Sequence, residues 1–327
     1  MTKKRNIALG AAGLAMAGPA AVLGAARWAY GYAFSPARDR SRNPYQLPGD
    51  RQSEQYRETI FNAVKRMEAL SCEKVSILSH DGLKLAGRYY HQKDGAPLML
   101  FFHGYRSPSL RDFSGGFWIY WEQGFNILIV DQRAHGESEG NVITMGIKER
   151  HDCVRWVEYC EERFGPSLKI WLGGISMGAA TVLMAAELLQ DHSSIKGILA
   201  DCGYSSVEGI MKGVIRNMKL PVEPSWWLLK LGARLYGGFD VTEASALESL
   251  KHCSFPVVFI DGREDRLLPF HMSLENRDAC ASENTVVFLA DGAGHGMSFF
   301  LDEEGYFDTV VTFIKKVLEE SDFSNCA

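Results

Sequence analysis

Short apolar runs alternate with helical patterns along most of this chain. A helix is predicted at about 53–70, and two strands at 74–78 and 83–90 are joined by the turn sequence His80-Asp81-Gly82. Six further apolar runs each lead into a helical pattern or an insertion: 98–102, 125–130, 168–172, 195–200, 257–260 and 285–289. Short runs rich in β-branched residues are typical of parallel strands buried on both faces. The alternation therefore predicts an α/β class with a mostly parallel, eight-stranded, doubly wound sheet.

An insertion interrupts this alternation after the sixth predicted strand. The segment from 203 to about 250 is too long for a simple connection, and its apolar residues fall into two helical patches. We expect a small helical cap near the carboxyl ends of the strands, where ligands bind on such sheets. Trp226 and Trp227 lie in the second patch. They are candidate substrate-binding residues that line a pocket, or they only pack the cap onto the sheet.

Composition narrows the function. The chain has 327 residues and a formal net charge of -5, yet residues 1–42 hold seven Lys or Arg against one acid. The remaining 28 basic and 39 acidic residues make the body acidic, which argues against nucleic-acid binding. The sequence has no zinc-type cysteine spacing, no P-loop and no plausible dinucleotide fingerprint, so we expect neither a metal nor a cofactor.

The N-terminal segment has the pattern of a targeting signal. The basic residues Lys3-Lys4-Arg5 come first, and the uncharged stretch 6–26 follows them. A Pro-rich tether then runs to about residue 50. The length favours a membrane anchor with the domain at 51–327 outside the cytoplasm. Gly24-Ala25-Ala26 would instead suit signal cleavage and secretion. A soluble helix is the third alternative, because most residues of 6–26 are Ala or Gly and its hydrophobicity is modest. Seven scattered cysteines without disulfide-type spacing fit a cytoplasm or an anaerobic exterior, and we give the targeting pattern more weight.

The most informative motif is Gly174-Ile175-Ser176-Met177-Gly178. It follows an apolar strand pattern and precedes an Ala/Leu-rich helix. A G-x-S-x-G turn between strand and helix indicates a nucleophile elbow, in which the serine lies at the tip of a strained turn. The first amides of the helix then point toward whatever the serine attacks.

Three further motifs follow predicted strands. Asp265 comes after the seventh strand, His295 after the eighth, and His103-Gly104-Tyr105 after the third. The order Ser, Asp, His is that of one class of serine hydrolase. Asp201 and Asp261 compete with Asp265 for the role of the acid, but the turn after Asp265 favours that residue.

With these motifs the chain resembles the α/β-hydrolase superfamily over about residues 70–320. More narrowly, it is similar to bacterial single-span serine hydrolases related to prolyl-oligopeptidase-like and serine-aminopeptidase-like catalytic domains. The resemblance also rests on the segment 131–138, Asp-Gln-Arg-Ala-His-Gly-Glu-Ser. Here Ala134 stands where relatives usually have glycine. The resemblance implies an α/β-hydrolase fold and a serine hydrolase that acts without a cofactor or an obligate protein partner.

A mechanism follows from the residue types. Ser176 would attack a carbonyl while His295 takes its proton, and Asp265 would orient the histidine. The backbone amides of Tyr105 and Met177 would hold the oxyanion. The expected activity is cleavage of small or medium acyl esters through an acyl-enzyme. A serine peptidase is the alternative, and a catalytically inactive binding protein is the rival from another class.

Overall fold

The fold is built on one eight-stranded sheet. The structure, a computed structural model, describes residues 2–37 and 43–324. Its strands are β1 (Glu73–Leu78), β2 (Lys84–Tyr90), β3 (Leu98–Phe102), β4 (Asn126–Asp131), β5 (Ile170–Ile175), β6 (Ile195–Asp201), β7 (Val257–Gly262) and β8 (Thr285–Ala290). They lie in the order β1-β2-β4-β3-β5-β6-β7-β8. Only the β1–β2 and β2–β4 pairings are antiparallel. The predicted fold class, a mostly parallel eight-stranded α/β-hydrolase sheet, is confirmed.

Helices cover both faces of the sheet. The described helices are α1 (Thr2–Phe34), α2 (Arg51–Gln55), α3 (Arg57–Ala69), α4 (Ser109–Asp112), α5 (Gly116–Glu122), α6 (Glu149–Phe164), α7 (Met177–Ala185), α8 (Val207–Asn217), α9 (Val222–Gly232), α10 (Ala246–Leu250), α11 (His271–Ala279), α12 (Ser298–Leu301), α13 (Glu303–Tyr306) and α14 (Thr312–Ser324). Three short turns of other helical type complete them: η1 (Ala186–Leu189), η2 (Ala233–Gly237) and η3 (Phe307–Val311). The helix predicted at 53–70 is divided at Tyr56, which leaves the helical conformation at φ -98° and ψ 13°.

Two apolar cores lie on opposite faces of the sheet. All residues of β3 and β4 are buried, as expected for central parallel strands. Alternate side chains of β3 supply each core, with Leu100 on the face covered by α6 and α7, and Phe101 on the face covered by α5 and α14. The sheet is therefore a rigid platform for the loops at its carboxyl end.

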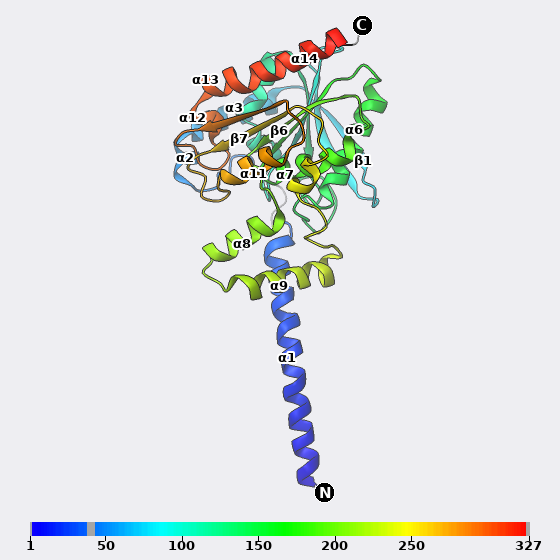
Figure 1. Cartoon of the computed structure of the whole chain (residues 1–327), viewed down its shortest axis with the longest axis vertical. Helices are drawn as coiled ribbons and strands as arrows, with labels where there is room; N and C mark the ends of the chain where they lie inside the picture. The colour runs from blue at the N-terminus through cyan, green and yellow to red at the C-terminus, as the bar shows by residue number, and fades with distance from the viewer. Residues whose placement is uncertain (1, 38–42, 325–327) are drawn as a thin grey trace.

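The cap consists of α8 and α9 and lies across α1 (Figure 1). Ser206 begins α8 by accepting a hydrogen bond from the Gly209 amide at 3.1 Å. The second half of α1 packs against α9, where Gly232 allows the two helices to approach closely. A Cβ added to Gly232 would lie 2.5 Å from the carbonyl oxygen of Ala26. The N-terminal half of α1 extends away from the body (Figure 1).

The predicted membrane anchor is wrong. Among the described residues, none of the helices combines the length with the hydropathy that a bilayer crossing requires. The stretch 6–26 is helical and long enough, but small Ala and Gly residues dominate it, and Pro19 lies inside the helix. The length of 6–26 favours an anchor, but its hydropathy is too low for a span, so the predicted single span with the domain outside the cytoplasm is wrong.

Glycines set the distance between α7 and the sheet. A Cβ at Gly178 would lie 1.7 Å from the backbone oxygen of Phe102, and one at Gly174 would lie 2.3 Å from that of Gly178. Both contacts are with backbone, which cannot rotate away as a flexible side chain could. No other residue type fits at these two positions without moving the helix.

We predict that Gly178→Ala lowers the free energy of unfolding by about 3 kcal/mol or more, because the added carbon overlaps β3. The matched control is Gly213→Ala in α8, where a Cβ would meet nothing within 4 Å. That change should raise stability by about 0.5–1 kcal/mol through helix propensity. Urea unfolding of both variants tests this, and equal effects would contradict the contact argument.

Candidate active site

Ser176 lies at the junction of β5 and α7 in a strained conformation. Its φ is 56° and its ψ is -116°, values that L-residues adopt only when the surroundings impose them. Its amide donates to the carbonyl of Asp201 on the neighbouring strand at 2.8 Å. Ser176 is half-buried, and it lies where β5 ends and α7 begins, which is at the carboxyl end of the sheet.

His295 and Asp265 lie beside this serine. The Nε2 atom of His295 is 3.0 Å from Oγ of Ser176, and its Nδ1 atom is 2.6 Å from Oδ2 of Asp265. The other oxygen of Asp265 accepts the amides of Leu267 and Leu268, each at 2.8 Å. These bonds fix the carboxylate. With Nδ1–H donating to Asp265, the lone pair of Nε2 is directed at the serine hydroxyl. The structure thus brings together the three side chains singled out from the sequence.

The charge around His295 favours its protonated form. Burial by itself would lower the pKa of this imidazole. The hydrogen bond and negative charge of Asp265, with the more distant Asp201 and Asp261, outweigh burial and raise the pKa above its ordinary 6.5. The site therefore stabilises the imidazolium that forms when histidine accepts a proton.

The two competing carboxylates have other surroundings. Asp261 accepts bonds from Oγ of Ser273 at 2.7 Å and from the Gly262 amide at 2.8 Å. Oδ1 of Asp201 is buried without a hydrogen-bond partner. Burial raises the pKa of both groups to about 7. Neither has a hydrogen bond to His295 among the described contacts, whereas Asp265 does.

The loop after β3 approaches the serine from the other side. A Cβ at Gly104 would lie 3.4 Å from Cβ of Ser176. The Gly104 amide donates to Oδ2 of Asp112 at 2.8 Å, and the Arg106 amide donates to Nε2 of His135 at 2.9 Å. The intervening Tyr105, one of the two predicted oxyanion donors, lines a cavity together with Ser176 and Met177. The loop is therefore held at the amides on both sides of Tyr105.

Two supports of this loop were missed from the sequence. Asp112 lies in the short α4, and Gln132 follows β4, so no local spacing relates either to the serine. The Gln132 amide donates to Nε2 of His103 at 3.1 Å, while Nδ1–H of His103 donates to the Gly104 carbonyl at 2.8 Å. His103 thus stabilises the loop through both ring nitrogens.

Ala134 adopts the conformation usually given to glycine. Its φ is 60° and its side chain is completely buried. The left-handed region costs an L-residue about 1 kcal/mol, so glycine would be the less strained choice. The neighbouring Arg133 anchors the segment through a buried ion pair with Asp152 at 2.6 Å.

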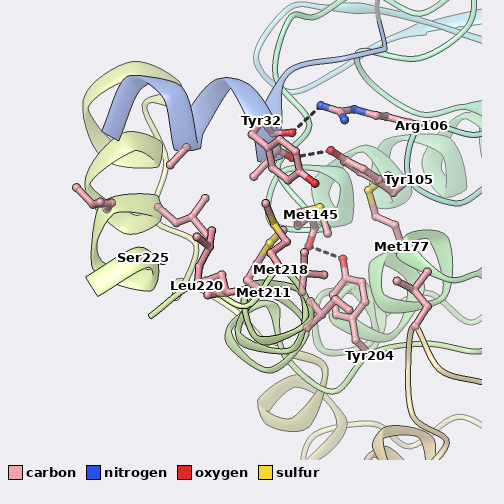
Figure 2. A pocket seen from close by; sticks show the side chains of 18 of the residues that line it. Tyr32, Tyr105, Arg106, Met145, Met177, Tyr204, Met211, Met218, Leu220 and Ser225 are labelled. Carbon is pink, nitrogen blue, oxygen red and sulfur yellow. Dashed lines mark hydrogen bonds between the residues drawn. The ribbon is translucent and has the colours of Figure 1, made fainter. Parts of the chain in front are cut away.

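Two cavities meet at Ser176. One, of about 450 Å³, extends between α1, α8 and α9 and is lined mainly by apolar side chains (Figure 2). The other, of about 600 Å³, includes His295, Gly104, Arg111 and Asp112 and is more polar. A ligand bound at Ser176 would therefore have a separate space on each side of the hydroxyl.

The predicted tryptophans lie outside both cavities. Trp226 is 2% exposed and packs in the core, and Trp227 is 52% exposed. Neighbours on a helix point about 100° apart, and α9 presents Ser225, Leu228 and Leu229 to the apolar cavity instead. The interpretation of Trp226 and Trp227 as substrate-binding residues is corrected on this ground.

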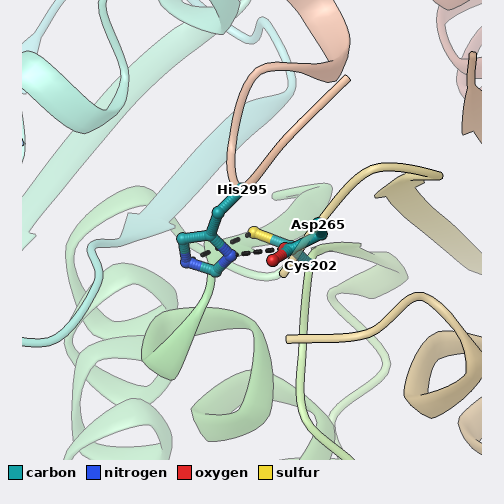
Figure 3. A group of neighbouring side chains, drawn as sticks. All are labelled: Cys202, Asp265 and His295. Carbon is teal, nitrogen blue, oxygen red and sulfur yellow. Dashed lines mark hydrogen bonds and ion pairs between the residues drawn. The ribbon is translucent and has the colours of Figure 1, made fainter. Parts of the chain in front are cut away.

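Cys202 completes a small cluster with Asp265 and His295 (Figure 3). Their potential ligand atoms lie within 4.8 Å of one another, and Sγ of Cys202 is 4.0 Å from Nε2 of His295. Both ring nitrogens of His295 already have hydrogen-bond partners. Burial also raises the pKa of the Cys202 thiol well above its ordinary value, which keeps it protonated. We therefore assign no metal to this cluster.

Known proteins show the same fold at low sequence identity. No protein-family model matches the chain. It is 25% identical to the uncharacterized protein YqkD of Bacillus subtilis over 80% of this chain and 85% of that protein. It is 24% identical to the lysophosphatidylserine lipase ABHD12 of Danio rerio over 56% of this chain and 46% of the lipase. The match therefore covers less than half of the length of the lipase.

A solved structure aligns over most of the body. The esterase Pf2001 of Pyrococcus furiosus superposes with a TM-score of 0.59 at 24% identity, covering 77% of this chain and 94% of the esterase. The agreement extends over nearly the whole esterase, so the sheet and its flanking helices share one architecture. Together with the strand order, this likeness shows that the chain has the α/β-hydrolase fold.

Proposed function

We propose that this protein is a serine hydrolase that cleaves carboxylic esters through an acyl-enzyme intermediate. The single observation that carries the proposal is the hydrogen-bonded series from Asp265 through His295 to Ser176, with separations of 2.6 Å and 3.0 Å. A serine hydroxyl is a weak nucleophile until an adjacent base accepts its proton. Binding alone does not require a buried acid, an oriented imidazole and a strained serine that are hydrogen-bonded in series, so this arrangement argues against an inactive binding protein.

In the first half of the reaction, Ser176 attacks the ester carbonyl and His295 takes the hydroxyl proton. The carbonyl oxygen becomes an oxyanion, which the amides of Met177 and Tyr105 would bind. One such donor contributes about 3 kcal/mol to transition-state stabilisation. His295 then donates its proton to the leaving alcohol, and the acyl group stays on Ser176. A water activated by the same histidine releases the acid and restores the serine.

Ester substrates fit the walls of the site better than peptides do. Among the described residues that line the apolar cavity, Arg106 is the one charged side chain, and its guanidinium donates to the carbonyls of Tyr32 and Ser35 rather than facing a peptide terminus. The names esterase and lysophosphatidylserine lipase on two similar proteins agree with ester chemistry. A serine peptidase of the prolyl-oligopeptidase or aminopeptidase type remains the second candidate, because the same serine could attack a peptide bond.

Substitution of the nucleophile gives the first test. Ser176→Ala should abolish labelling by a fluorophosphonate probe and lower kcat for a p-nitrophenyl ester by about 10⁴-fold or more, because no other serine in the described part of the chain lies at such a strand–helix junction. The control is Ser193→Ala, an exposed surface serine. Labelling of Ser176→Ala at the wild-type level would refute the assignment.

The pH dependence tests the acid. Activity needs neutral His295, so kcat/KM should fall below an apparent pKa that lies above 6.5. Asp265→Asn removes the neighbouring charge, so the pKa should drop and the acidic limb should move to lower pH. The maximal rate should also fall by up to about 10⁴-fold. Asp201→Asn is the comparison and should lose far less. If Asp201→Asn proves the more damaging change, Asp201 is the acid.

A substrate panel separates the two candidate activities. We expect the purified protein to hydrolyse p-nitrophenyl esters with a kcat/KM at least about 100-fold above that for aminoacyl and prolyl p-nitroanilides. Ser176→Ala serves as the blank for both series. A preference for the anilides would favour the peptidase.

A further inference from the structure

The second half of α1 forms one wall of the apolar cavity. Five of its side chains line the space beside Ser176: Ala25, Trp28, Ala29, Tyr32 and Ala33. Their spacing of three and four residues places them on one face of the helix. The cavity therefore borders not only the cap but also a segment that precedes the catalytic body in the sequence.

The opposite face of α1 is fixed to the cap. Ala26, Tyr30 and Phe34 are buried, and Phe34 packs edge-on against Phe239 with ring centroids 5.2 Å apart. The backbone of Ala26 passes so close to Gly232 that a Cβ there would overlap it at 2.5 Å. A helix held this closely has little freedom to move away from the cavity.

The end of α1 is joined to the loop that carries a proposed oxyanion donor. The hydroxyl of Tyr105 donates to the carbonyl of Ala33 at 2.9 Å. The guanidinium of Arg106 donates to the carbonyls of Tyr32 at 2.9 Å and Ser35 at 3.0 Å. A cation at the C-terminal end of a helix satisfies carbonyls that have no partner within the helix. The wall therefore begins at a fixed distance from Ser176.

The facing wall is also apolar. It comes from α8 and α9 and includes Met211, Val214, Met218 and Leu228. Figure 2 shows the lining side chains extending from Met177 and Tyr105 at one end to Leu220 and Ser225 at the other. Methionines adapt their shape to a flexible ligand, and the elongated lining suits a chain rather than a ring.

We propose that residues 25–33 of α1 are the specificity-determining wall of an acyl-chain site that takes unbranched chains of roughly ten carbons. This inference rests on the proposed ester hydrolysis and names its substrate class. Ala25 and Ala33 are separated by about 12 Å along the helix axis, which an extended alkyl chain of roughly ten carbons matches. The leaving alcohol then lies in the more polar cavity beside His295 and Arg111.

A nested series of substitutions tests the wall. Ala29→Phe and Ala25→Phe place a ring in the cavity one helical turn apart, with Ala29 nearer to Ser176. For p-nitrophenyl esters from acetate to palmitate, kcat/KM relative to acetate should fall beyond a cut-off length in each variant. The cut-off for Ala29→Phe should be about four or five carbons shorter, because the sites are about 6 Å apart. Beyond it, each excluded methylene should cost about fourfold.

Ala21→Phe is the matched control, since Ala21 is exposed on α1 and lies outside the cavity lining. It should keep the wild-type chain-length profile. Identical profiles for Ala25→Phe, Ala29→Phe and Ala21→Phe would overturn the proposal, as would a wild-type preference for acetate over decanoate.

A second measurement covers the case in which a phenylalanine disturbs folding. Ala29→Cys makes a smaller change, and its thiol can be alkylated by a maleimide and located by peptide mass spectrometry. Prior labelling of Ser176 with a decyl fluorophosphonate should slow that alkylation at least about tenfold, whereas an ethyl fluorophosphonate should not. Equal alkylation rates after both labels would overturn the proposal.

The proposed function fails in a different way. If Ser176 takes no fluorophosphonate and no ester of any length is cleaved, ester hydrolysis itself is refuted. If esters are cleaved and Ser176 is labelled, but the substitutions in α1 leave the chain-length profile unchanged, only the acyl-site proposal is refuted.

Discussion

The close contact between α7 and the sheet is the constraint on which the site depends. Gly178 lies against the backbone of Phe102, and Gly174 lies against Gly178, with no space for a side chain at either position. This contact forces Ser176 to a φ of 56°, which turns its hydroxyl out of the sheet. Because backbone packing fixes the position of the serine, the loops after β7 and β8 have only to place Asp265 and His295 within hydrogen-bond distance of it and of each other. The strain at one residue is offset by the burial of the whole helix.

The parts of the fold that local patterns control were predictable from the sequence. Apolar runs of four to six residues identified the central strands, since a strand buried on both faces carries few polar residues. Gly174-Ile175-Ser176-Met177-Gly178 was informative because strand, turn and helix signals coincide there. Asp265 and His295 followed from their positions just after strands, where side chains reach the same edge of a parallel sheet. Even the preference for Asp265 over Asp201 came from its local turn, and the hydrogen bond to His295 agrees with it.

What the sequence did not reveal depends on contacts between distant segments. Trp226 and Trp227 are adjacent, and only the docking of α9 decides that one is buried and the other exposed. Asp112 supports the loop after β3 from a short helix with no motif of its own. The uncharged stretch 6–26 has the length of a membrane anchor, but its small residues contribute too little hydropathy for a span. Docking of α1 on the cap could not be inferred, because helix pairing leaves no local signature beyond small residues such as Gly232.

The packing of α1 against the cap also sets an order of events during synthesis. The hydroxyl of Tyr236 donates to the carbonyl of Leu23 across 213 residues of sequence. At translation rates of about 5–20 residues per second, α1 leaves the ribosome roughly 10–40 s before its partner helix exists. During that interval the aromatic side chains of α1 have no native surface to cover them. His295 emerges later still, 119 residues after Ser176. The nascent chain therefore carries the serine without its base, and the three side chains can meet only after residue 295 has been made.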